Sequence, residues 1–174
     1  MPIKLYHGTP YTLTEIKLDA GRGYKDFGKG FYLATNRQQA VGMMNKKYRE
    51  LSRKSPANLA WIKKNLYSFD FNKELLHTVS YKVFDVTDTQ WLDFILSCRS
   101  CRQTPHHYDI VIGPTADDDT TFCLNNYREG LYGPPDALES KRVLMRNLET
   151  ENLGTQVFVA TSKGLTLLEN MQLI

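Results

Sequence analysis

The sequence has few cysteines and no long apolar stretch, and each absence excludes a class of protein. Its 174 residues contain three cysteines, an odd number that does not fit the disulfide framework of a small secreted domain. No apolar run approaches the length that spans a bilayer, and the amino terminus lacks the apolar core of a signal peptide. We therefore expect a cytoplasmic protein with no membrane partner.

The chain also lacks internal repeats, low-complexity tracts and linkers rich in Pro, Gly or Ser. Its length is typical of one domain, so we expect residues 1–174 to form a single domain. Hydrophobic residues make up 41% and charged residues 24%, which is ordinary for a globular protein and excludes a largely disordered one. The formal net charge of +3 is too small to indicate nucleic-acid binding by itself.

Apolar periodicity and turn signals predict strands and helices in irregular alternation. The expected strands are 3–7, 30–35, 66–71, 78–84, 108–112 and 155–160. The expected helices are one that begins at Asn36, then 87–98, 120–128 and 136–148, while 163–168 fits either type. Because no regular β-α-β repeat is present, this order favours an α+β protein with a mainly antiparallel or split β-sheet over a doubly wound one.

Two segments combine strand-like sequence with polar residues and glycines. Residues 6–9 read Tyr-His-Gly-Thr, and residues 26–35 read Asp-Phe-Gly-Lys-Gly-Phe-Tyr-Leu-Ala-Thr. A strand fixes the residue at its end, and a neighbouring glycine lets a ligand approach the backbone, so His7 and Tyr32 could face one pocket. From spacing alone, a carbonyl-bonded histidine and a core aromatic are the more frequent outcome.

Together with residues 108–114 (Tyr-Asp-Ile-Val-Ile-Gly-Pro), these segments resemble the pattern of a bacterial family on the ADP-ribosyltransferase fold. The fold is that of diphtheria toxin and poly(ADP-ribose) polymerases. The resemblance to the bacterial family spans nearly the whole chain, whereas the match to the wider group rests on the first two segments and the last strand. It implies an ADP-ribosyltransferase-like split β-sheet with flanking helices. It also implies an NAD-dependent mono-ADP-ribosyltransferase, which cleaves the nicotinamide–ribose bond.

The resemblance assigns roles to the matching positions. His7 would hydrogen-bond a ribose hydroxyl of NAD, the Gly8 backbone would bind the nicotinamide amide, and Tyr32 would stack on the nicotinamide ring. Gly28 and Gly30 would let the loop pass close to the dinucleotide. Three further residues are expected to line the rim of the site: Arg22, Asp26 and Phe27. The expected NAD-binding residues are His7, Gly8, Thr9, Arg22, Asp26, Phe27, Gly30, Tyr32 and Met43.

Gln156 completes the expected catalytic set with His7 and Tyr32. Family members commonly have a glutamate at this position, the start of a late strand. Cleavage passes through an oxocarbenium-like transition state, which Gln156 can stabilise by hydrogen bonding but not by charge. Glu149 and Glu151 lie a few residues upstream and leave a second alignment open.

Met43 stands where family members often have a second aromatic residue beside the nicotinamide. A thioether packs against an aromatic ring less specifically, and plain core packing explains the position at least as well. Gln156 and Met43 together keep a second interpretation open, in which the chain is a weakly active or inactive module that binds NAD or ADP-ribose. An NAD glycohydrolase, which transfers to water, is a third.

Three other patterns have simpler explanations. Cys98-x-x-Cys101 followed by His106 lacks a fourth zinc ligand, so we expect no metal site. The aspartates 117–119 suit the N-terminus of the next helix better than a bound cation. A basic cluster over 46–64 is typical of a solvated helix face, although it would also suit a nucleic-acid or acidic protein target.

The acceptor of ADP-ribose, a protein or a nucleic acid, remains open because the loops that select it carry no signal. The resemblance is strongest to toxin-like members. By analogy it implies a toxin–antitoxin pair, with an antitoxin as partner, or a role in phage defence.

Overall fold

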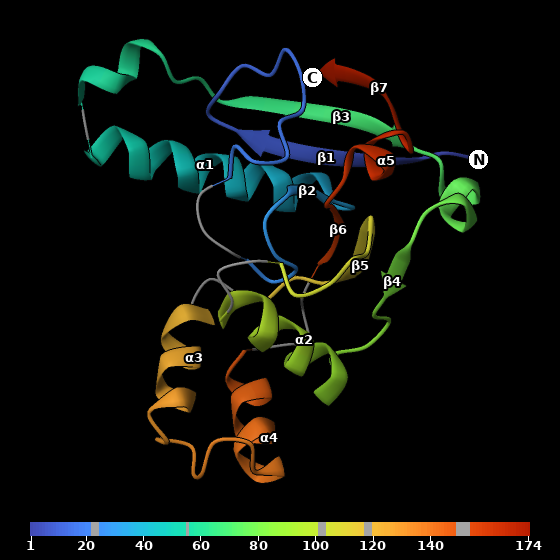
Figure 1. Ribbon diagram of the computed structural model, residues 1–174. Helices are drawn as coiled ribbons and strands as arrows, with labels where there is room; N and C mark the ends of the chain where they lie inside the picture. The colour runs from blue at the N-terminus through green and yellow to red at the C-terminus, as the bar shows by residue number, and fades with distance from the viewer. Residues whose placement is uncertain (22–24, 55, 101–103, 117–119, 149–153) are drawn as a thin grey trace.

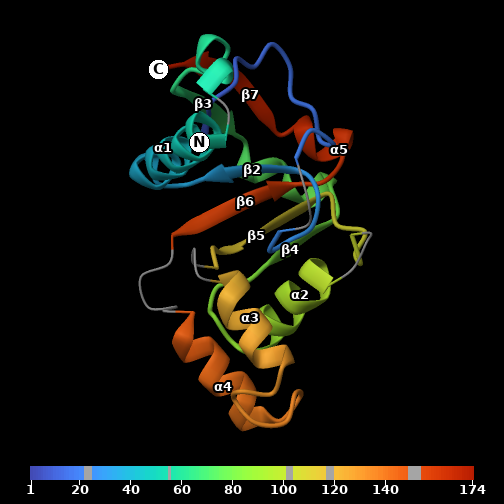
Figure 2. The ribbon, with the colours of Figure 1, turned by 90° about the vertical axis from the view of Figure 1, so that its left-hand side faces the viewer.

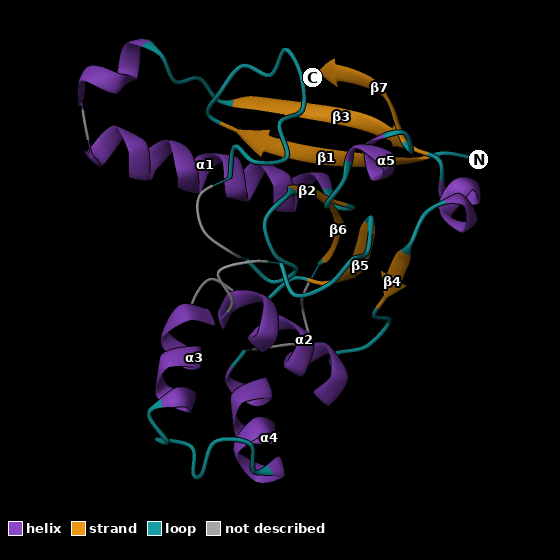
Figure 3. Ribbon diagram, viewed as in Figure 1, coloured by secondary structure: helices purple, strands orange, loops and turns teal. Residues whose placement is uncertain are grey.

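The computed structural model describes residues 1–174 except 22–24, 55, 101–103, 117–119 and 149–153, and shows helices packed on one seven-stranded mixed sheet (Figures 1 and 3). The strands are β1 (Ile3–Thr9), β2 (Phe31–Ala34), β3 (Asn65–Phe71), β4 (Tyr81–Val83), β5 (Ile110–Pro114), β6 (Thr155–Val159) and β7 (Leu168–Leu173). The α-helices are α1 (Arg37–Lys54), α2 (Thr89–Ser100), α3 (Thr120–Arg128), α4 (Leu138–Asn147) and α5 (Ser162–Leu165), and the 3-10 helices are η1 (Pro56–Ala60) and η2 (Lys73–Thr78). The expected α+β class is confirmed.

The strand order is β4-β5-β6-β2-β1-β3-β7, and every neighbouring pair is antiparallel except β4 with β5. The expected mainly antiparallel sheet is therefore confirmed. The connection at the centre of the sheet is weak. β1 pairs with β3 along its whole length, and β2 pairs with β6 along its whole length, but β1 meets β2 only at Tyr6 and Ala34.

The two halves of the sheet are covered by different helices (Figure 2). α1 packs on the half formed by β1 and β3, where Ala40 and Met44 lie against Leu66. α2, α3 and α4 pack on the half formed by β5 and β6, around a second core cluster that includes Phe158. Tyr32 of β2 packs against this second cluster, so it lies where the two halves meet.

The expected helix starts agree with the observed caps. The Asn36 side chain accepts from the Gln38 N–H at 2.7 Å before α1, and Asp88 accepts from the Trp91 N–H at 2.9 Å before α2. These bonds satisfy N–H groups that have no partner inside the helix. No helix in the described part of the chain is both long enough and apolar enough to cross a membrane.

Candidate functional site

His7 and Tyr32 are joined across the weak centre of the sheet. The His7 ring Nδ1 lies 2.7 Å from the Tyr32 carbonyl oxygen. A carbonyl oxygen can only accept, so Nδ1 carries the hydrogen and donates it. The His7 ring also stacks on Phe31, with the two centroids 4.4 Å apart. The structure thus brings together the two residues that the sequence motifs singled out.

Burial keeps His7 neutral. Desolvation lowers its pKa from 6.5 to about 4, opposed by the bond to Tyr32 and assisted by the charges of Lys47 and Lys25. At pH 7 the ring is therefore neutral, and because Nδ1 holds the hydrogen, Nε2 holds the lone pair. His7 offers a hydrogen-bond acceptor, which is the group that a sugar hydroxyl requires.

The Tyr32 hydroxyl is held by the loop that precedes β2. It donates to the Gly28 carbonyl oxygen at 2.7 Å and accepts from the Phe27 N–H at 3.1 Å. Burial, followed by the negative charge of Asp26, raises the pKa of Tyr32 well above its ordinary value. The hydroxyl is thus a structural anchor, and the partly buried ring is what Tyr32 can offer to a ligand.

Two lysines outside the expected site, Lys25 and Lys47, act on these rings. Lys25 Nζ is 5.4 Å from the centroid of the Tyr32 ring, within cation–π range. Burial lowers the pKa of Lys25. Burial and then repulsion from Lys25 lower the pKa of Lys47, on α1, to about 8, with Glu50 acting in the opposite direction.

These two lysines concentrate positive charge near His7. Both also lower the pKa of His7, so the three groups lie within electrostatic range of one another. None of the ion pairs between described residues includes Lys25 or Lys47. A bound anion would offset the mutual repulsion of the two ammonium groups, which makes a phosphate group a suitable ligand.

Gln156 lies in β6 and is only 7% exposed. Its Nε2 donates to Asp26 Oδ2 at 2.8 Å and, more weakly, to the Pro114 carbonyl oxygen at 3.4 Å. In the sheet it faces Ala34 of β2, two residues after Tyr32. Because alternate strand residues share a face, Gln156 lies on the same face of the sheet as Tyr32, and its amide nitrogen is committed to Asp26.

The Asp26 carboxylate is the centre of a buried polar network. Its Oδ1 accepts from Arg99 Nε at 2.9 Å and from the same guanidinium's Nη2 at 2.6 Å. Its Oδ2 accepts from the Ala116 N–H at 3.0 Å and from Gln156. This carboxylate therefore ties the loop before β2 to α2, to β6 and to the segment after β5.

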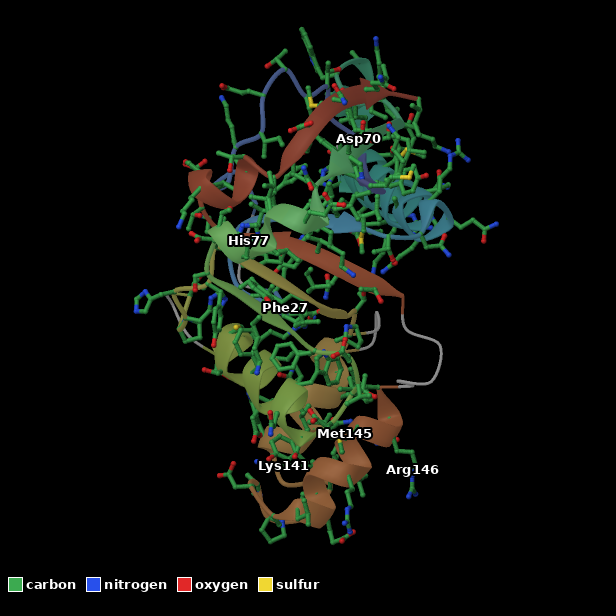
Figure 4. The ribbon with its side chains drawn as sticks, turned by 90° about the vertical axis from the view of Figure 1, so that its right-hand side faces the viewer. Phe27, Asp70, His77, Lys141, Met145 and Arg146 are labelled. Atoms are coloured by element: carbon green, nitrogen blue, oxygen red, sulfur yellow. The ribbon has the colours of Figure 1, made fainter. Side chains whose placement is uncertain are left out.

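The expected rim positions of Asp26 and Phe27 are wrong. Asp26 is 4% exposed and Phe27 is 0% exposed. The Phe27 ring packs among three other aromatic rings, those of Phe84, Phe94 and Phe158. Figure 4 shows it where the sheet meets the helices. Because Asp26 bonds inward to Arg99, the loop turns both side chains into the core and away from any ligand.

Gly8 and Gly30 allow the protein to pack closely on itself. A Cβ at Gly8 would overlap the Ala40 carbonyl oxygen of α1, and a Cβ at Gly30 would overlap the Val159 carbonyl oxygen of β6. The fold therefore requires both glycines. Their expected contacts with a dinucleotide remain predictions.

Asn65 is a candidate that sequence reasoning missed. It pairs with Thr9 at the end of β1, and the Thr9 hydroxyl accepts from the Tyr11 N–H at 3.3 Å. Asn65 is 7% exposed, and its buried Nδ2 has no partner among the described residues. Directly paired and alternate strand residues share a face, so Asn65, Thr9 and His7 lie on the same side of the sheet. A buried donor of this kind suits a water or ligand oxygen. The sequence did not indicate this role, because an asparagine beside a strand is typical of a turn.

Met43 is 39% exposed, whereas its neighbour Met44 packs in the core. Core packing therefore does not explain Met43, and its expected place beside the nicotinamide remains a prediction. Three other candidates, Arg22, Glu149 and Glu151, lie outside the described residues.

The alternative zinc pattern includes residues that have other partners. Cys98 is buried on α2, and Cys101 lies outside the described residues, as do the aspartates 117–119. Both ring nitrogens of His106 are used by the protein: Nε2 donates to the Phe27 carbonyl oxygen at 2.8 Å, and Nδ1 accepts from the Tyr108 N–H at 3.2 Å. His106 thus fixes the loop before β2, which also holds Tyr32.

Comparison with known proteins gives a family without an assigned activity. No curated protein matches the chain. A family model described as a protein of unknown function (DUF3990) matches residues 3–170. Because this match covers nearly the whole sequence, the chain belongs to the DUF3990 family.

Proposed function

We propose that the protein is an NAD-dependent mono-ADP-ribosyltransferase, a glycosyltransferase built on an ADP-ribosyltransferase-like split β-sheet. In the reaction the bond between ribose C1′ and the nicotinamide nitrogen breaks, and its electron pair leaves with neutral nicotinamide. An oxygen or nitrogen of the acceptor then bonds to C1′ and its proton passes to solvent. The contact between His7 and Tyr32, where β1 and β2 share one register pair, supports this proposal.

The hydrogen-bonding state of His7 carries the proposal. A ribose hydroxyl is a donor to the neutral ring, and Nε2 is the matching acceptor. The reacting ribose becomes oxocarbenium-like, and a protonated imidazole beside it would oppose that positive charge. The pKa of about 4 keeps His7 uncharged at neutral pH.

Tyr32 would receive the nicotinamide ring, and the two lysines would receive the pyrophosphate. Nicotinamide in NAD is cationic, so the ring that attracts the Lys25 ammonium offers nicotinamide the same cation–π attraction. Lys25 would then move from the ring and, with Lys47, pair with the pyrophosphate, where each ammonium forms charge-assisted bonds.

Gln156 would act by hydrogen bonding alone. Its Nε2 is already bonded to Asp26, so the remaining polar atom is Oε1, an acceptor that suits a ribose hydroxyl. An amide supplies no negative charge to the transition state, so turnover is expected to be slower than with a carboxylate. This observation favours a second candidate, a weakly active or inactive module that binds NAD or ADP-ribose, and an NAD glycohydrolase is the hydrolytic variant of the first.

The cellular setting rests on the resemblance to toxin-like enzymes. A toxin-type or phage-defence effector, held in check by an antitoxin, would fit an enzyme that consumes NAD. Expression of the intact protein should then slow growth, and His7→Ala should relieve this effect.

The first test is incubation of the purified protein with labelled NAD, with and without cell lysate, following free nicotinamide and label on macromolecules. His7→Ala is expected to lower nicotinamide release at least about tenfold, because the bond to a ribose hydroxyl is lost. Tyr32→Phe should retain most of the release, since the ring remains. His107→Ala, at an exposed histidine, is the matched control and should have no effect.

Three outcomes separate the candidates. Label on protein or nucleic acid that depends on His7 supports the transferase. Release without labelling indicates the glycohydrolase. Binding of NAD without release contradicts the catalytic proposal and leaves the binding module.

The affinity for ADP-ribose is expected to fall about tenfold between about pH 7 and pH 9. With a pKa of about 8, Lys47 is roughly nine-tenths charged at the lower pH and roughly one-tenth charged at the higher pH, whereas the pyrophosphate stays ionised. His7, with a pKa of about 4, is neutral throughout this range. Calorimetric titration at several pH values measures the slope.

Lys47→Arg is the matched variant, because a guanidinium stays charged at both pH values. It should remove most of the slope and retain the affinity seen at pH 7. An unchanged slope in this variant would show that Lys47 does not contact the phosphates.

A further inference from the structure

Positive charge is concentrated in one stretch of the chain. Residues 46–64 contain seven basic residues and one acidic residue, Glu50, for a net charge of +6. The whole chain carries +3, so the remainder carries −3. This stretch, here called the basic segment, consists of the C-terminal part of α1, η1 and residues 61–64, together with Ser55, which lies outside the described residues.

Four of these basic residues are exposed and have no acidic partner within ion-pair distance in the described part of the chain. Arg49, Arg53, Lys54 and Lys63 are exposed, and none of them takes part in an ion pair between described residues. Unpaired cations in such number create a local positive potential that draws polyanions.

The residues that follow α1 in the basic segment are tied to the rest of the fold, and η1 lies beyond the C-terminal end of α1 (Figure 1). Lys64 Nζ lies 5.3 Å from the centroid of the Tyr48 ring on α1. The Lys63 N–H donates to the Pro10 carbonyl oxygen at 2.8 Å, which ties residues 61–64 to the loop after β1. The same helix packs on β1, where Gly8 lies against Ala40 and Met44, so the basic segment belongs to the helix that borders the strand of His7.

Exposed aromatic rings lie among these cations. Trp61 is 83% exposed and Tyr11, next to Pro10, is 53% exposed. A solvent-facing indole contributes little to folding, because its apolar surface remains in water. Aromatic rings beside cations are the arrangement that binds single-stranded nucleic acid, in which unpaired bases stack and phosphates pair with Lys or Arg. An acidic protein would use the cations but has no general use for the exposed indole.

We propose that the basic segment binds single-stranded nucleic acid, with bases stacked on Trp61 and phosphates paired with Lys63, Lys64 and the exposed basic residues of α1, which are Arg49, Arg53 and Lys54. This binding does not depend on the proposed function. The proposal has a second part, which rests on the proposed function: the bound strand is the acceptor, and one of its oxygen or nitrogen atoms forms the bond to C1′ as nicotinamide leaves.

The test is fluorescence anisotropy of the full chain with labelled single-stranded RNA and DNA of about 15 nucleotides, at several salt concentrations. Trp61→Ala should weaken binding about tenfold, as expected for one stacked base. Lys63→Gln/Lys64→Gln should reduce the slope of log affinity against log salt by about 1.4, for two lost phosphate contacts. Comparing RNA with DNA shows which of the two strands binds more tightly.

Matched controls lie elsewhere on the surface. Phe122 is 67% exposed on α3, and Phe122→Ala should leave the affinity unchanged. Lys17→Gln/Lys73→Gln removes two exposed lysines outside the basic segment and should leave the salt slope unchanged. All of these side chains are exposed, so thermal unfolding should be unaffected and loss of binding is not loss of fold.

Equal binding of duplex and single strand with no dependence on Trp61 would overturn the proposal, and so would tighter binding of polyglutamate than of either strand. Nicotinamide release without any acceptor should be unchanged in Trp61→Ala. If the protein binds the strand through Trp61 but releases no nicotinamide, the proposed function is refuted and the strand-binding site is supported. If it releases nicotinamide but does not bind the strand, the strand-binding site is refuted and the proposed function is supported.

Discussion

Replacement of Asp26 by asparagine is expected to lower the free energy of unfolding by about 3–5 kcal/mol, the range for removing one partner of a buried ion pair. The carboxylate accepts from Arg99 twice, from the Ala116 N–H and from Gln156. An asparagine has one acceptor oxygen and turns an NH₂ group towards donors. The Arg99 guanidinium, only 19% exposed, would lose its counter-charge. Urea unfolding at neutral pH measures the loss.

Asp93→Asn is the matched control. Asp93 pairs with Lys141 at 2.7 Å, but its side chain is 52% exposed, and exposed pairs contribute under about 1 kcal/mol. If the two variants lost equal stability, the Asp26 network would not be what holds the loop before β2. If Asp26→Asn is as destabilising as expected, NAD binding should weaken with it, because the same loop carries Lys25 and the anchors of the Tyr32 hydroxyl.

The local signals in the sequence predicted most of the sheet and helices because caps and apolar periodicity act over short distances. The helix expected to begin at Asn36 is capped by that residue, and the helix expected over 87–98 is capped by Asp88 and buries Trp91 and Ile95. The strand expected over 78–84 is only partly present, since η2 occupies its start and β4 is confined to Tyr81–Val83.

β7 shows why the rest of the sheet could not be predicted. Its sequence, Leu-Glu-Asn-Met-Gln-Leu, has no apolar alternation, and five of its six residues are exposed. It is a strand because β3 pairs with it at the edge of the sheet, and such long-range pairing leaves no local pattern. The residues just before it, for which either type was open, form α5.

The candidate site also contains residues that local motifs predicted and residues that only long-range contacts explain. His7 and Tyr32 were predicted because they lie in short motifs, and the structure joins them by one hydrogen bond. Asp26 is buried because it pairs with Arg99, which is 73 residues away in the sequence. The burial of Asp26 therefore could not be inferred from the motif around it. Lys25 and Lys47 are 22 residues apart in the sequence, so the repulsion by which Lys25 lowers the pKa of Lys47 depends on the folded chain and could not be inferred from the motifs.

Gln156→Glu is expected to destabilise the protein by about 3–4 kcal/mol at pH 7, although it introduces the residue that is common at this position in the enzymes whose motifs the sequence resembles. The new carboxylate would replace an amide nitrogen that lies 2.8 Å from Asp26 Oδ2 in a buried position. Two buried carboxylates at this distance cannot both ionise easily, so the pKa of the pair rises by several units, and each unit corresponds to about 1.4 kcal/mol.

The loss of stability in Gln156→Glu depends on pH, and its direction follows from the raised pKa. A carboxyl whose folded pKa is raised above its unfolded value of about 4.3 binds more protons in the folded state between those two values. Stability relative to the parent protein should therefore be lost as the pH rises from about 4.3 and recovered as it falls back. Gln90→Glu, at an exposed position in the first turn of α2, is the control and should show no such loss.

The double variant Asp26→Asn/Gln156→Glu decides whether the position is catalytic or structural. It exchanges the donor and the acceptor, since the new amide at position 26 can donate a hydrogen bond to the new carboxylate at position 156. One carboxylate remains near Arg99. We expect it to be more stable than either single variant, a coupling that a double-mutant cycle measures. If it also releases nicotinamide faster than the parent, a charge at position 156 assists cleavage, and Gln156 limits turnover in the native protein. Recovered stability with unchanged release would assign Gln156 to the fold and leave His7 and Tyr32 as the reacting site.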